Sequence, residues 1–119
     1  MVFFMRVYIA IILLFSFNVS AEIVSCDTKM SSFIIEADRK SDEKYSNLFL
    51  IKFTDQNDVP FKCNGATFGY IENTSGAHDS IVSLSFFLTA QNQMATMKIE
   101  SNDRIGAAAR IEYILPVNN

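Results

Sequence analysis

The sequence predicts a small domain that is mainly β, with one α-helix and one disulfide. Short alternating or continuous apolar stretches, separated by polar turns, recur along the chain and are typical of strands. One longer apolar run, Asp79–Gln91, has the length of a helix. The chain also has two cysteines, Cys26 and Cys63.

Residues 1–21 have the pattern of a secretory signal peptide. One basic residue, Arg6, precedes an apolar block over 7–17, and small or β-branched residues end the segment at Ala21. This block is too short for the roughly 20 residues that cross a bilayer, which disfavours a membrane anchor. Cleavage after Ala21 removes 21 of the 119 residues and leaves 98, so we expect one secreted or periplasmic domain over 22–119.

The charge of the chain disfavours nucleic-acid binding. The formal net charge is −3, and it becomes −4 when Arg6 is removed with the signal peptide. Lysines and arginines do not cluster, and no basic stripe alternates with aromatic residues. No segment after residue 21 is apolar enough to predict a membrane span.

The two cysteines predict one disulfide. Export places Cys26 and Cys63 in an oxidising compartment, where such a pair is normally bonded. The bond would close a loop of some 37 residues and contribute about 3–4 kcal/mol. Two free thiols or half a metal site are the alternatives; both are disfavoured because His78 is the only histidine and no CxxC spacing is present.

Five segments outside the central hairpin predict strands. They are residues 22–28, 33–37, 48–53, 94–101 and 110–115. Leu48–Phe53 is almost continuously apolar, which predicts a strand covered on both faces. Arg39–Asn47 is highly charged and predicts a solvated loop, Asn102–Asp103 a turn, and Arg104–Ala109 a small-residue segment approached by another backbone.

A β-hairpin is predicted around Asn64-Gly65. This dipeptide favours a two-residue turn between strands, and apolar residues lie on both sides of it. The turn would place three apolar pairs on one face, namely Cys63 with Ala66, Phe61 with Phe68, and Val59 with Tyr70.

The long apolar run fits two structures by its periodicity. As a strand it would place Val82, Leu84, Phe86 and Leu88 on one face, and as a helix Ile81, Leu84 and Leu88 form one stripe. The length of the run favours the helix, with Asp79 or Ser80 as its N-cap.

Nothing in the sequence predicts catalysis. Ser75, His78 and Asp79 are too close in sequence to adopt a catalytic-triad geometry easily, and the acidic pairs lie in polar loops. Asn73-Thr74-Ser75 is a glycosylation sequon or simply a loop. We therefore expect a binding protein that is not an enzyme and has no cofactor or metal ion.

Two passages carry a resemblance to a known family. Leu88–Ser101 followed by Ala109–Tyr113 resembles the end of Shiga-type toxin B subunits, and Leu48–Lys52 through Cys63 is similar to the central strands of pertussis-like and subtilase-type B subunits. Leu50 stands where the subtilase-type relatives have a cysteine. The resemblance implies an OB-fold, a five- to six-stranded Greek-key barrel capped by a helix, assembled as a homopentamer that carries a toxin A subunit.

The resemblance also implies a lectin function in virulence, with host cell-surface glycans as partners. Relatives hold a terminal sialic acid with a serine before the second strand and polar loop residues beside it, which places the site at Ser31, Ser32 and Asp55. The alternative for the two serines is that they only turn the chain.

Two other functions remain open at the level of sequence. A monomeric periplasmic β-barrel inhibitor, similar to lysozyme inhibitors, would share the size, export and disulfide but would have no helix at 79–91. A small secreted hydrolase is the least favoured hypothesis.

Overall fold

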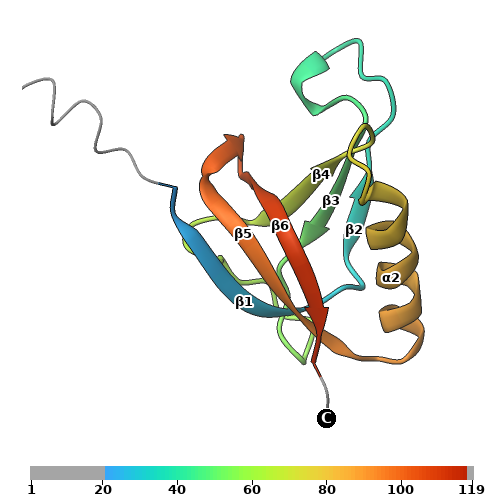
Figure 1. The fold of residues 1–119 in the computed structure, drawn as a ribbon, viewed down its shortest axis with the longest axis vertical. Helices are drawn as coiled ribbons and strands as arrows, with labels where there is room; N and C mark the ends of the chain where they lie inside the picture. Colours follow the sequence, from blue (N-terminus) through green and yellow to red (C-terminus); the bar gives the residue numbers. More distant parts are fainter. Residues whose placement is uncertain (1–20, 118–119) are drawn as a thin grey trace, which may run out of the picture.

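The computed structural model describes residues 21–117 and consists of one curled sheet and one α-helix (Figure 1). The predicted signal peptide, apart from Ala21, lies outside the described residues. A 3₁₀ turn, η1 (Glu43–Tyr45), interrupts the predicted charged loop. The other elements in chain order are β1 (Ile23–Lys29), β2 (Phe33–Ile35), β3 (Leu48–Lys52), β4 (Phe68–Glu72), α2 (His78–Ala90), β5 (Met94–Ile105) and β6 (Ala108–Pro116).

The sheet is curled because its two end strands are consecutive in the chain. The strand order is β1-β5-β6-β4-β3-β2, and every pair is antiparallel except β4 with β6. Only Met30–Ser32 connects β1 to β2. Four Cα steps from Lys29 to Phe33 span at most about 14 Å, so the two ends of the sheet must approach each other.

Backbone hydrogen bonds join the chain at this closing point. The Lys29 N–H donates to the Thr54 carbonyl at 3.0 Å, and the Lys52 N–H donates to the Ser32 carbonyl at 2.7 Å. The end of β3 and the residues just after it are therefore hydrogen-bonded both to the end of β1 and to the residue before β2.

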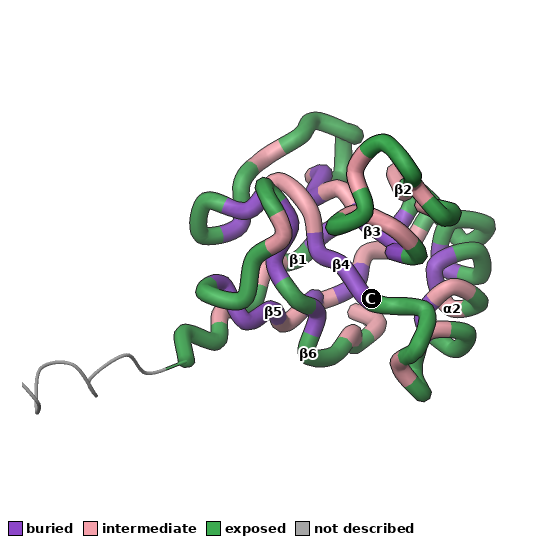
Figure 2. The backbone as a smooth tube through the Cα atoms, turned by 90° about the horizontal axis from the view of Figure 1, so that it is seen from above, coloured by how far each residue is buried: buried purple, intermediate pink, exposed green. Residues whose placement is uncertain are grey.

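The helix prediction is confirmed, and its predicted caps are wrong. Helix α2 lies against the β2 side of the sheet in Figures 1 and 2, and Ile81 and Leu88 are buried. The helix begins at His78 after an Ala77 cap, so Asp79 and Ser80 fall inside its first turn and cannot cap it. Asp79 still suits that position, since a carboxylate there lies at the positive end of the helix dipole.

The Asn64-Gly65 turn forms, but the long hairpin does not. Cys63 and Ala66 exchange two backbone hydrogen bonds at 2.9 Å, and both turn residues have positive φ, 47° and 86°. Beyond that pair the two arms separate. The predicted pairs of Phe61 with Phe68 and Val59 with Tyr70 are absent because β4 lies between β3 and β6 instead.

The β5–β6 turn lies further along the chain than predicted. β5 continues through Asn102–Asp103 as a bulge and ends at Ile105. The Glu100 carboxylate accepts the backbone N–H groups of Asn102 and Asp103, at 2.5 and 2.8 Å, which satisfies the bulge. Gly106, with φ of 57°, supplies the left-handed residue that the turn requires.

Strand β3 is buried on both faces, as its apolar sequence predicted. Phe49 and Ile51 face the main core, whereas Leu48 and Leu50 face a smaller cluster with Tyr70 and Ala108. Figure 2 shows these buried segments enclosed by exposed loops. The second predicted strand is shorter than expected and ends at Ile35.

The predicted disulfide is present. It joins Cys26 on β1 to Cys63 at the turn, with a Cα–Cα distance of 6.1 Å and a sequence separation of 37. A loop of this length corresponds to about 4 kcal/mol in the chain-entropy model.

The small-residue segment that was expected to meet another backbone does so. Ala108 and Ala109 pair in parallel with Phe68 and Gly69 of β4. A Cβ added at Gly69 would lie 2.5 Å from Met97 Sδ and 2.9 Å from Ile111 Cγ1.

We therefore predict that Gly69→Ala lowers the free energy of unfolding by about 1–3 kcal/mol, because the extra methyl overpacks the core. Urea denaturation measures this change. Gly76→Ala is the control, since a Cβ there meets nothing within 4 Å. Equal denaturation midpoints for the two variants would contradict the prediction.

Candidate functional site

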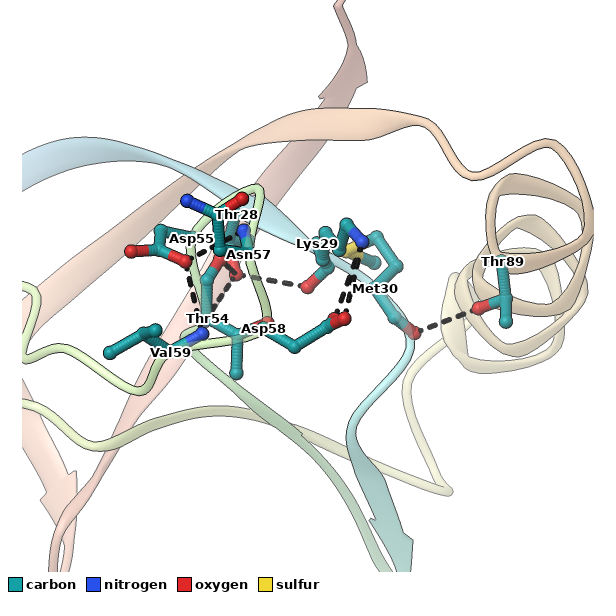
Figure 3. Close-up of polar contacts among 9 residues, drawn as sticks. All are labelled: Thr28, Lys29, Met30, Thr54, Asp55, Asn57, Asp58, Val59 and Thr89. Carbon is teal, nitrogen blue, oxygen red and sulfur yellow. Dashed lines mark hydrogen bonds and ion pairs between the residues drawn. The ribbon is translucent and has the colours of Figure 1, made fainter.

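The predicted site serines lie in the link between β1 and β2. Ser31 is exposed and Ser32 is half-buried. Neither hydroxyl has a hydrogen-bond partner among residues 21–117, so both are free to bind a ligand. The buried Met30 precedes them, and its carbonyl accepts a hydrogen bond from Thr89 Oγ1 at 3.2 Å (Figure 3).

The hollow beside Ser31 is small. Its volume is about 10 Å³, and its lining includes Ser31, Asn92 and Gln93. Such a volume holds one water molecule and no sugar ring. A glycan at Ser31 would therefore lie on the surface.

The electrostatics around Ser31 are mixed. The hollow adjoins the last turn of α2, which is the negative end of the helix dipole and disfavours a ligand carboxylate. Lys29 also lines it and supplies positive charge, with its side chain 13 % exposed. Lys29 is already paired with Asp58 at 3.4 Å, which reduces that attraction.

Asp55, the third predicted site residue, is used within its own turn. Its Oδ1 accepts the backbone N–H groups of Asn57 at 2.8 Å and Val59 at 3.0 Å (Figure 3). The fold places this turn beside the end of β1 through the Lys29–Asp58 ion pair. One carboxylate oxygen, Oδ2, stays available to a ligand.

Thr28 and Thr54 connect β1 to this turn. Thr28 Oγ1 accepts the Thr54 N–H at 3.0 Å and lies 2.9 Å from the Lys29 carbonyl and 3.2 Å from the Thr54 carbonyl, either of which it can donate to. Thr54 Oγ1 is buried and has no partner in the described part of the chain. The Thr28 hydroxyl therefore stabilises the fold, whereas burial of the Thr54 hydroxyl destabilises it.

Two further pockets meet at the end of β4: the first lies where β4 and β6 separate after pairing in parallel up to Tyr70 and Arg110, and the second lies between the end of β4 and the loop around η1. One is about 250 Å³ and the adjoining one about 280 Å³, and they share Glu72 and Thr74. We call this region the fork pocket; the first cavity is also lined by Tyr70, Ile71, Ser75, Arg110 and Ile111.

Asp103 binds two of the residues that line the fork pocket, Tyr70 and Arg110. Its carboxylate accepts the Tyr70 hydroxyl at 3.0 Å and Arg110 Nη1 at 3.4 Å. Burial, together with the hydrogen bond to Asp103, raises the pKa of Tyr70, so this hydroxyl keeps its proton. The hydrogen bond to Asp103 also raises the pKa of Arg110, whose side chain is 53 % exposed and keeps free donors.

The fork pocket suits a polyhydroxylated ligand. Its lining combines the guanidinium of Arg110, the carboxylate of Glu72 and the hydroxyls of Thr74 and Ser75 with the apolar side chains of Ile71 and Ile111. Sequence reasoning missed it because Tyr70 and Arg110 are 40 positions apart and are brought together only by the parallel pairing of β4 with β6. Their alternation within strands gives no sign of a ligand.

The residues considered for catalysis do not form a triad. His78 Nδ1 lies 3.0 Å from Asp79 Oδ1, while Ser75 Oγ accepts the Ala77 N–H at 3.3 Å. Within residues 21–117, no group of three or more His, Cys, Asp or Glu side chains is arranged to hold a metal ion. In the same range, no helix has the length and apolar character needed to span a bilayer.

Comparison of the chain with protein-family models, curated proteins and solved structures finds no match.

The two threonines predict opposite effects on stability. Thr28→Val removes the acceptor of the buried Thr54 N–H and should lower the free energy of unfolding by about 1–3 kcal/mol. Thr54→Val replaces an unpartnered hydroxyl and should be neutral or stabilise by up to about 1 kcal/mol. Chemical denaturation of the two variants checks this, and a larger loss for Thr54→Val would contradict it.

Proposed function

We propose that this domain is an OB-fold. The support comes from its connectivity: β1 and β2 act as one bent strand that pairs with β5 at one end and β3 at the other. The parallel β4–β6 pair and the position of α2 between β4 and β5 agree with a five-stranded Greek-key barrel carrying one helix.

On this fold we propose a non-catalytic, glycan-binding B subunit of a secreted toxin, assembled as a homopentamer that carries an A subunit. One observation supports this assembly. Phe86 and Phe87 on α2 are 53 % and 60 % exposed, and the edge strand β2 also exposes Ile34 and Ile35. The rings of Phe33 on β2 and Phe86 on α2 are in contact, with centroids 5.0 Å apart. The exposed apolar residues of α2 and β2 therefore lie on two elements that pack together. Adjacent exposed apolar side chains of this kind are typical of protein interfaces.

Glycan binding is supported by the polar surfaces of the domain. The Ser31–Ser32 link has free hydroxyls, and the fork pocket has the size and the donors for a sugar ring. Such shallow sites bind single glycans weakly, and five linked copies would raise the overall affinity through avidity.

The alternative of a monomeric inhibitor loses one of its expectations, since it predicted no helix at 79–91 and α2 occupies His78–Ala90. Its remaining expectation is a monomer in solution.

We predict that the protein recovered after export has the native mass of about five chains. Phe87→Asp should shift it to smaller species, because a charge cannot be buried at the interface without a partner. Ser41→Asp, at an exposed position in the loop before η1 and off the helix, is the control and should keep the assembly. Native mass spectrometry measures the species, and a monomeric wild-type chain would favour the inhibitor.

We further predict binding to sialylated glycans on an array. Ser31→Ala should reduce binding about tenfold if the serine link is the site, since one hydrogen bond to a charged group contributes roughly 1.5 kcal/mol. Arg110→Ala should do so if the fork pocket is the site. Lys40→Ala, an exposed loop residue with the same charge change, is the control. Unchanged binding in both test variants would remove both surfaces as sites, and the absence of any glycan binding would contradict the lectin function.

A further inference from the structure

The predicted cleavage point lies directly before a firmly held residue. Four hydrogen bonds fix Glu22: its N–H donates to Glu100 Oε1 at 2.7 Å, its carbonyl accepts the Ser101 N–H at 2.8 Å and Oγ at 3.2 Å, and its Oε1 accepts Asn64 Nδ2 at 3.1 Å. The first residue of the predicted mature chain is therefore an integral part of the fold.

Glu100 is a buried carboxylate without a cation. Glu100 is 9 % exposed, and its carboxylate accepts hydrogen bonds from three backbone N–H groups, those of Glu22, Asn102 and Asp103. No lysine, arginine or histidine of residues 21–117 forms an ion pair with it. Backbone dipoles solvate this carboxylate, but no counter-charge from the described residues is paired with it, so the site can still accept a cation.

The neighbouring charges do not supply one. Arg104 uses Nε on the Ser101 carbonyl and Nη2 on the Asn64 carbonyl. Arg110, the register partner of Glu100 on β6, is paired with Asp103. The side chain of Glu22 adds a second carboxylate to the same region.

We infer that cleavage after Ala21 completes this site: the new α-ammonium of Glu22 forms an ion pair with the Glu100 carboxylate. Hydrolysis of the Ala21–Glu22 peptide bond consumes one water, leaves a carboxylate on Ala21 and an amine on Glu22, and the amine takes up a proton. The nitrogen already lies 2.7 Å from Oε1, so no movement of the chain is needed. Processing thus converts a neutral hydrogen bond into a charge-assisted one.

The sign of the pH dependence follows from this pair. A free α-amine has a pKa of about 7.7–8.0, and the Glu100 carboxylate raises it in the folded state. The stabilisation is therefore complete below about pH 7.5 and is lost as the pH rises through the folded-state pKa. Glu22 and Asp103 act in the same direction, whereas Arg104 and Arg110 oppose it.

The first experiment tests the premise, which is the predicted cleavage. The full chain is expressed with export, and the intact mass of the recovered protein is measured. A mass that begins at Glu22 is expected. A chain that begins at any other residue overturns the inference without bearing on the proposed glycan function.

The second experiment tests the ion pair on the recovered protein. Its α-amine is acetylated at pH 6.5 in denaturant, where lysines are protonated and unreactive, and the chain is refolded. The acetylated protein should melt at least about 5 °C lower than the free one at pH 6.5, and the two should converge near pH 10.5. Equal melting temperatures at pH 6.5 overturn the inference.

Glu100→Gln provides the specific control. In this variant acetylation should change the melting temperature little, because the acceptor charge is gone. Glu112→Gln, an exposed position on β6, should keep the full wild-type difference. A difference that survives in Glu100→Gln overturns the pairing, and if that variant does not fold, the comparison in the wild-type chain decides alone.

Discussion

The three-residue link Met30–Ser32 forces the sheet to close. It joins two strands that lie at opposite ends of the sheet order, so the sheet has to curl until its ends meet. Curling creates an interior, which Met30, Phe49 and Ile51 fill. The link is fixed on both sides, by Thr89 of α2 and by the hydrogen bonds between Thr28 and Thr54.

The curled sheet also explains why polar chemistry gathers at a few places. Where β4 and β6 separate, their side chains and the following loop leave space that water or a ligand can enter. Where β5 bulges, Glu100 replaces the missing ladder hydrogen bonds with a carboxylate. Both features arise from the departure of a strand from regular pairing, and both bring charged groups together from distant parts of the chain.

The two candidate glycan surfaces differ in physical character. At the serine link the hydroxyls are free, but the adjoining end of α2 and the occupied Lys29 weaken attraction for an anion. In the fork pocket Arg110 is oriented by Asp103 and still exposed, and the cavity is large enough for a ring. The first candidate surface was expected from the family resemblance, whereas the second is apparent only in the folded chain.

The local features of this protein could be predicted from its amino-acid sequence. The length of Asp79–Gln91 predicted a helix, the continuous apolar run Leu48–Phe53 a strand buried on both faces, and the cysteine pair a disulfide. These predictions rest on the length and composition of short segments, or on a single pair of thiols.

The pairing of the strands could not be predicted in this way and is seen only in the folded chain. Asn64-Gly65 made its turn, yet Tyr70 left the predicted hairpin because β3 and β6 offered a longer set of backbone hydrogen bonds on both sides of β4. The fork pocket and the Glu22–Glu100 contact depend on the same choice of partners. Pairing is decided by the total burial and hydrogen bonding of the whole sheet, which no short stretch of sequence contains.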